Sequence, residues 1–348
     1  FDPALDALSR IVTERIPVVL EADSRDEIHR VLDFAKELNL RPILYGGEEA
    51  WKVADRLKKE NVPVILRLDM VEPKTSKSQK DNPPPKRVVD NQRADYERIL
   101  RNASVLQKQG ILFAISTQGQ PSDSTKSFRE NLLKVIEHGL NPEDALRALT
   151  TNAARILGVE QQLGSLAVGK AAHLVVMTDD FHKKNAQVRY SFADGVRFEY
   201  EVKEKKDAEK KPEKKKAKPK KDKQASELES DRKPLTETGG NVLIRGATVL
   251  TITKGVKKDT DVLVQNGKIA KIGANLKAPE GTTIIDAKGM HLMPGIVDTH
   301  CHFSISGGTN EFSLSVVPEV RVRDVVRSSD ISIYRGLAGG LTTARLLH

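Results

Sequence analysis

The sequence predicts an α/β protein that contains a parallel sheet and, later in the chain, a region of short strands. Two observations predict this class. Near-continuous apolar runs alternate with amphipathic helical segments in the first third of the chain, and a covered parallel sheet is typical of that pattern. From Val242 onward, short apolar runs are separated by turn residues instead. The four apolar runs of the first region are residues 16–20, 42–45, 62–68 and 110–115.

The helices between these runs are predicted from their spacing. Asp2 and Pro3 form an N-cap and a first-turn proline, and Leu5, Leu8 and Val12 lie on one face of the helix that follows. Four strand–helix units of this kind fit half of a closed barrel or a doubly wound sheet, and periodicity alone does not distinguish the two. The other helical patterns lie at residues 28–35, 51–57 and 94–106.

Two features interrupt or close this first region. Residues 71–90 are rich in lysine, serine and proline, which indicates an exposed loop at the C-terminal end of a strand. Such a loop is either part of an active-site rim or a tolerated insertion. Two helices are expected after the fourth apolar run, the second starting at residues 141–143 and ending at Gly158.

Charge is concentrated in one segment. Residues 203–223 hold twelve lysines and five acidic residues, which accounts for +7 of the net charge of +9. A lysine-rich run without large apolar residues does not bury enough surface to order itself, so we expect a disordered linker and no nucleic-acid partner. No run reaches the roughly 18 to 20 apolar residues of a membrane span. The single cysteine excludes an intramolecular disulfide and slightly favours the cytoplasm, but the compartment stays unassigned.

Two histidines end a strand in the last quarter of the chain. Asn266 and Gly267 indicate a two-residue hairpin, and a further turn precedes an apolar run that leads to His300 and His302. Side chains alternate along a strand, so the two imidazoles share a face while Cys301 points to the other. Two imidazoles on one face are half of a zinc site. The alternative is a chance pair of surface histidines.

The segment Met293-Pro-Gly-Ile-Val-Asp-Thr-His-Cys-His302 resembles the opening of the amidohydrolase superfamily, and most closely its imidazolonepropionase-like branch. The resemblance implies a partial (β/α)8 TIM-type barrel, together with a small β-sandwich domain built from chain segments that flank the barrel. Further matching segments are residues 141–158, 163–176, 242–249, 261–269, 285–289 and 339–344.

The resemblance also implies an unusual order, because the C-terminal half of one module precedes the N-terminal half of another. Barrel strands three and four are missing, which favours a segment of a tandem-module protein over a circular permutation, and the native N-terminus is expected to be missing as well. The expected divisions are a barrel half with strands five to eight, sandwich strands, a lysine-rich linker, further sandwich strands, and the first two barrel strands. These correspond to residues 1–160, 161–200, 201–238, 239–293 and 294–348.

By the same resemblance, His300 and His302 bind a divalent metal, with zinc favoured. The other metal ligands and the catalytic Asp of such enzymes align with Glu21, Gly46 and Gln118, none of which is the expected residue. Glycine offers no ligand, and a glutamine amide does not accept the proton that the Asp handles. The first module is therefore expected to be degenerate, with Glu21 as a rim carboxylate.

The implied function is metal-dependent hydrolysis of non-peptide carbon–nitrogen bonds in a small amide or cyclic amide. His348, at the end of the second strand, is a candidate substrate contact. The alternatives are a non-catalytic scaffold or binding protein and a prolidase-like peptidase. The two halves are expected to dock as one unit, with residues 295–299 parallel to 111–115 and the histidines facing Gln118. The oligomeric state is not predicted.

Overall fold

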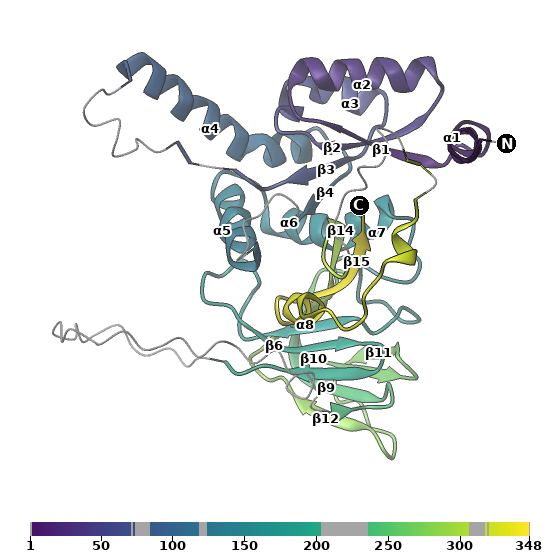
Figure 1. Ribbon diagram of the computed structural model, residues 1–348. Helices are drawn as coiled ribbons and strands as arrows, with labels where there is room; N and C mark the ends of the chain where they lie inside the picture. Colours follow the sequence, from purple (N-terminus) through teal and green to yellow (C-terminus); the bar gives the residue numbers. More distant parts are fainter. Residues whose placement is uncertain are drawn as a thin grey trace, which may run out of the picture.

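The computed structural model describes residues 2–70, 72–73, 84–117, 124–202, 236–305, 317–318 and 320–347. These residues form three sheets (Figure 1). A parallel four-stranded sheet lies at one end, a nine-stranded sheet at the other, and a two-stranded sheet lies between them. No helix in the described ranges has the length and apolar character needed to cross a bilayer.

The four apolar runs of the first region form parallel strands in the order β1-β2-β3-β4, as predicted. The helices expected between them are also present, and a short 3₁₀ turn, η1 (Ala50–Val53), leads into α3. The strands are β1 (Pro17–Ala22), β2 (Arg41–Gly46), β3 (Val64–Arg67) and β4 (Phe113–Ser116), and the helices are α1 (Pro3–Thr13), α2 (Arg25–Glu37), α3 (Ala54–Lys59) and α4 (Lys86–Lys108).

The helix predictions need two corrections. Helix α4 begins at Lys86, inside the segment expected to be a loop, because Pro85 precedes the first turn and helix-forming residues follow it. The helix expected from residue 141 to Gly158 is broken into α6 (Pro142–Leu149) and α7 (Thr151–Ile156). Thr150 leaves the helical conformation at φ −133° and ψ −88°, and its hydroxyl donates to the Leu146 carbonyl at 2.6 Å. Before these two helices lies α5 (Ser124–Glu137).

The nine-stranded sheet is built from both halves of the chain. Its order is β11-β10-β9-β13-β5-β6-β7-β8, with β12 attached to β9. Strand β5 pairs antiparallel with β13, which confirms that the halves dock through strand pairing. The strands are β5 (Leu174–Met177), β6 (Val188–Ala193), β7 (Val196–Glu199), β8 (Thr236–Glu237), β9 (Val242–Leu250), β10 (Val256–Gln265), β11 (Lys268–Gly273), β12 (Thr283–Asp286) and β13 (His291–Pro294).

Local turn chemistry positions several of these strands. Asn266 and Gly267 both have positive φ, 50° and 72°, so the predicted two-residue hairpin between β10 and β11 is confirmed. Strand β8 lies at the end of the segment expected to be a linker. Residues 203–235 of that segment lie outside the described residues.

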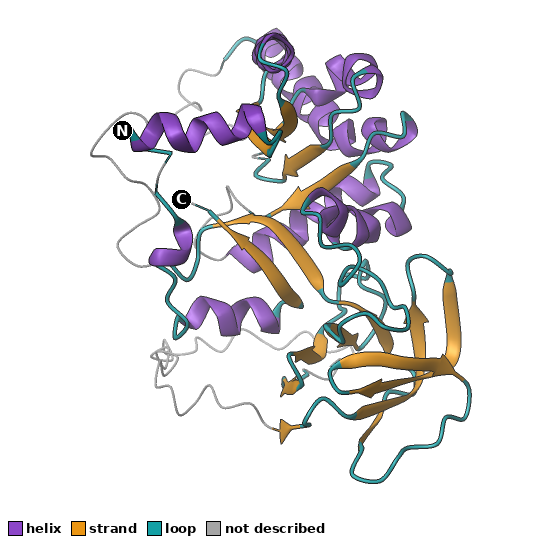
Figure 2. Cartoon of the chain, turned by 90° about the vertical axis from the view of Figure 1, so that its right-hand side faces the viewer, coloured by secondary structure: helices purple, strands orange, loops and turns teal. Residues whose placement is uncertain are grey.

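The third sheet consists of the parallel strands β14 (Ile296–Cys301) and β15 (Leu341–Leu346). The 3₁₀ turn η4 (Val322–Asp324) and helix α8 (Ile331–Ala338) precede β15. Strand β14 also contacts β4, but among the described strands its ladder is with β15 alone. The expected pairing of residues 295–299 with 111–115 is therefore wrong in its hydrogen bonds. Together the six parallel strands and their helices form a partial barrel beside the nine-stranded sheet (Figure 2).

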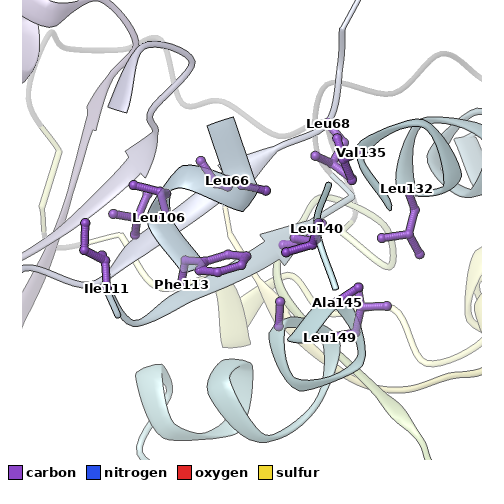
Figure 3. Packing of buried hydrophobic residues seen from close by; sticks show 14 of the residues in the cluster. Leu66, Leu68, Leu106, Ile111, Phe113, Leu132, Val135, Leu140, Ala145 and Leu149 are labelled. Atoms are coloured by element: carbon purple, nitrogen blue, oxygen red, sulfur yellow. The ribbon is translucent and has the colours of Figure 1, made fainter. Parts of the chain in front are cut away.

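A continuous apolar core holds the parts together. Figure 3 shows how buried side chains from strands and helices of the first half pack together, with Phe113 between Leu106 and Leu149. The same core extends to Leu250 and Met293 of the second half. Fully burying each large apolar side chain contributes roughly 1.5 to 3 kcal/mol, so the shared core favours a fixed arrangement of the two halves.

Candidate metal-binding site

His300 lies in β14 and His302 directly follows it, and the two side chains lie on one side, as the alternation predicts. The Nε2 atoms of His300 and His302 lie 3.2 Å apart, and the ring planes make an angle of 69°. Two nitrogens that each lie 2.0 to 2.1 Å from one tetrahedral ion would be separated by about 3.4 Å. The pair therefore fits two positions in the coordination shell of a single metal ion.

The second ring nitrogen of each histidine is in a different environment. The Nδ1 atom of His302 lies 3.0 Å from the carbonyl oxygen of Leu347. A carbonyl only accepts, so Nδ1 carries the proton and Nε2 keeps its lone pair, which is the usual arrangement of a metal-ligating histidine. The Nδ1 atom of His300 is buried and has no hydrogen-bond partner among the described residues.

The surroundings keep His300 neutral. Burial, followed by the positive charges of His302, Arg345 and Arg67, lowers the pKa of His300 from 6.5 to about 4. The neutral imidazole is the form that binds a metal. The two arginines would also repel an incoming cation, so the site combines candidate ligands with an opposing electrostatic field.

Asp298 fixes the strand that carries the pair. Its carboxylate is buried and accepts hydrogen bonds from the backbone N–H of His300 at 3.1 Å and from the N–H and hydroxyl of Thr117. The Ser116 hydroxyl donates to the carbonyl of His300 at 3.0 Å. Burial raises the pKa of the Asp298 carboxyl. Strands β4 and β14 are thus joined by side-chain hydrogen bonds in place of the expected ladder.

The strand ends of the first half are arranged around a guanidinium. Arg67 donates to Glu21 at 2.7 Å and to Asp23, and its Nε lies 3.8 Å from a carboxylate oxygen of Asp69. Gly46 has φ +94°, and a Cβ there would lie 2.5 Å from Oδ1 of Asp23. Glu21 is therefore already paired with an internal cation, and no side chain fits at position 46 without displacing Asp23.

An aromatic ring of the first half contacts one histidine of the pair in the second half. Tyr45, at the end of β2, stacks on His300 with ring centroids 4.1 Å apart and an interplanar angle of 23°. The guanidinium carbon of Arg67 lies 5.5 Å from the centroid of the same ring. His300 of the second half, a candidate ligand, therefore contacts a side chain of the first half.

The structure brings together only part of the site expected from the sequence. His300 and His302 converge, whereas Gln118 and His348 lie outside the described residues. In the described part of the chain, no group of three or more potential ligands surrounds one point. Tyr45 and Arg67 were not expected from the sequence. The one available signal was that Arg67 interrupts an otherwise apolar run.

The parallel strands, their covering helices and the paired histidines define a barrel-type α/β protein with a candidate metal site. The chain belongs to the amidohydrolase family, whose model matches residues 23–197. This confirms the resemblance at the level of the superfamily.

Curated relatives and a solved structure are similar to parts of the chain. A dihydroorotase from Geobacter metallireducens is 40% identical over 67 residues, which are 19% of this chain and 16% of that enzyme. A dihydropyrimidinase from Dictyostelium discoideum is 36% identical over 103 residues, 30% of this chain and 18% of its own length. An amidohydrolase crystal structure from Thermotoga maritima MSB8 is 24% identical with a TM-score of 0.46, covering 55% of this chain and 46% of that one. The chain thus matches less than a fifth of each of these two curated relatives.

Proposed function

We propose that this chain is part of a metal-dependent amidohydrolase that cleaves a non-peptide carbon–nitrogen bond in a small cyclic amide. The observation that carries the proposal is the convergence of the His300 and His302 Nε2 atoms at 3.2 Å. The similarity to a dihydroorotase and a dihydropyrimidinase supports the choice of a cyclic substrate. It agrees with the substrate class that the imidazolonepropionase-like resemblance implies.

His300 and His302 would hold the metal ion, for which zinc is favoured. A bound ion of this kind supplies an activated water and polarises the scissile carbonyl. The Leu347 carbonyl keeps the proton of His302 on Nδ1, so that Nε2 is available as a ligand. Asp298 holds the backbone at the first ligand through the His300 N–H.

Two nitrogens fill only half of a tetrahedral shell. We propose that the remaining ligands and the general base belong to a longer polypeptide of tandem modules. In that arrangement, residues 1–200 end one module, and residues 241–348 begin the next. The pairing of Glu21 with Arg67 and the crowding at Gly46 support the view that the first module has lost its metal.

The ligand assignment is tested by equilibrium dialysis of the 348-residue chain against zinc. We expect one weakly bound ion per chain, lost in His300→Ala and in His302→Ala. His291→Ala, which removes another strand histidine, is the matched control and should bind zinc like the wild type. A tightly held zinc that survives dialysis would contradict the incomplete site, and zinc retained in His300→Ala would contradict the ligand assignment.

The competing function is a non-catalytic scaffold, which the internally neutralised strand ends around Arg67 favour. An activity assay separates the two. A polypeptide extended beyond His348 should open dihydrouracil or dihydroorotate in the presence of zinc, and His300→Ala should abolish turnover. An extended protein that binds no metal and opens neither ring would support the scaffold.

A further inference from the structure

We propose that Tyr45, which belongs to the first half of the chain, is the positioning residue for the metal ligand His300 of the second half. The inference rests on the proposed function, because it takes His300 to be a ligand. It adds that the site is completed across the two halves, so the degenerate first half still serves the metal site.

The need for such a residue follows from the difference between the two histidines. A metal-ligating histidine is normally held in place by a hydrogen bond at its other ring nitrogen. His302 has this support, because its Nδ1 lies 3.0 Å from the Leu347 carbonyl. The Nδ1 of His300 has no hydrogen-bond partner among the described residues, although it is buried. At this side of the His300 ring, packing therefore takes the place of a hydrogen bond.

Tyr45 provides that packing. Its ring lies nearly parallel to the imidazole, with centroids 4.1 Å apart and planes inclined by 23°. A stacked ring limits the rotation of the imidazole about its side-chain bonds, and in this orientation Nε2 is directed at the Nε2 of His302. The contact is made by the face of the tyrosine, so a phenylalanine should reproduce it.

Tyr45 is itself firmly held. Its side chain is 1% exposed and packs with Ile43 and Ile65. Arg67 lies over the ring, with its guanidinium carbon 5.5 Å from the centroid, and is fixed in turn by Glu21 and Asp23. The ion pairs of Arg67 thus hold the Tyr45 ring in the position where it packs against His300.

The test compares variants at position 45 in the full 348-residue chain. Tyr45→Phe keeps a planar face, whereas Tyr45→Leu and Tyr45→Met keep apolar bulk without one. Zinc affinity should stay within about twofold in Tyr45→Phe and fall by roughly 10- to 100-fold in the other two, as for lost outer-shell support. Tyr190→Leu is the matched control, because Tyr190 also lies under guanidinium groups, those of Arg189 and Arg197, but touches no metal ligand. It should leave zinc affinity unchanged.

A second readout uses no metal. In protein with ¹³C-labelled histidine, the ring signal of His300 should carry a ring-current shift in the wild type and in Tyr45→Phe. The shift should disappear in Tyr45→Leu and Tyr45→Met. Circular dichroism establishes that each variant is folded. If one of the two non-aromatic variants does not fold, the other still provides the test.

The outcomes separate the two proposals. If the wild type binds no zinc, the proposed function fails, and the ring signal still decides whether Tyr45 orients His300. If folded Tyr45→Leu or Tyr45→Met keeps the wild-type affinity and ring signal, Tyr45 is not the positioning residue. An equal loss of affinity in Tyr45→Phe would also overturn the proposal, since it would assign the effect to the hydroxyl.

Discussion

The polar side chains at the strand ends of the two halves are paired in different ways. In the first half, Arg67 is paired with Glu21 and Asp23, so the charges are balanced by side chains of the chain itself. In the second half, the Nε2 atoms of His300 and His302 lie 3.2 Å apart, and no carboxylate is close enough to complete a ligand group in the described residues. If the proposal holds, the first half keeps its packing without a metal because an internal cation neutralises its carboxylates, whereas the two histidines of the second half would share a bound ion.

The two regions also differ in the space that they leave for a metal ligand or an ion. Position 46 takes a side chain only if Asp23 moves, because a Cβ there would lie 2.5 Å from Oδ1 of Asp23. The His pair, in contrast, has the separation expected for two ligands of one ion. The proposed loss of the metal from the first half is thus supported by both charge and shape. The predictions below test this difference, from the largest expected effect to the smallest.

The largest effect is expected for Gly46→His, which restores a histidine at one of the aligned ligand positions. The substitution must adopt a positive φ and displace Asp23, so it should lower the free energy of unfolding by about 4 kcal/mol without creating a metal site. Gly169→His is the matched control, because Gly169 has a similar φ of +91° and open space around it. Urea denaturation measures both. Tight zinc binding by a stable Gly46→His protein would show that the first half is not closed to a metal.

The next effect concerns pH in metal-free protein. His300 has its pKa lowered to about 4 in the folded state, so the unfolded chain binds an extra proton between pH 6.5 and about 4. The stability that His300 contributes is therefore fully present above pH 6.5 and is lost as pH falls, by about 3 kcal/mol in all. Unfolding measured in urea at both ends of this window should show the loss, and His300→Gln should remove that part of it. If the stability of His300→Gln depended on pH as that of the wild type does, the pKa of His300 would not be lowered by folding.

A smaller effect is expected for Arg67→Met, which leaves Glu21, Asp23 and Asp69 without their cation. Stability should fall by about 2 kcal/mol, because the partly buried carboxylate of Asp23 loses its cation and the three carboxylates then repel one another. Millimolar calcium should raise the melting temperature of this variant more than that of the wild type. Arg98→Met, which breaks the exposed pair with Asp95, is the control and should change little. If Arg67→Met were as stable as the wild type, the internal-cation account would fail.

The sequence predicts those parts of the molecule that depend on neighbouring residues. The four parallel strands, the hairpin at Asn266 and the common face of His300 and His302 all follow from local periodicity or turn chemistry. The break at Thr150 was missed, because one hydroxyl bonding back to Leu146 leaves no clear pattern. The stack of Tyr45 on His300 and the bond from Thr117 to Asp298 were also missed. Both join residues far apart in the chain, and only the folded arrangement shows them.

The central claim is that one set of strand ends binds a metal and the other does not. It is tested most directly by following the ¹⁵N signals of all eight histidines during a zinc titration. The account predicts that the Nε2 signals of His300 and His302 shift together, in proportion to bound zinc, while the other six histidines are unaffected. Zinc-dependent shifts at a different histidine, or at Nδ1 of His302 in place of Nε2, would contradict it.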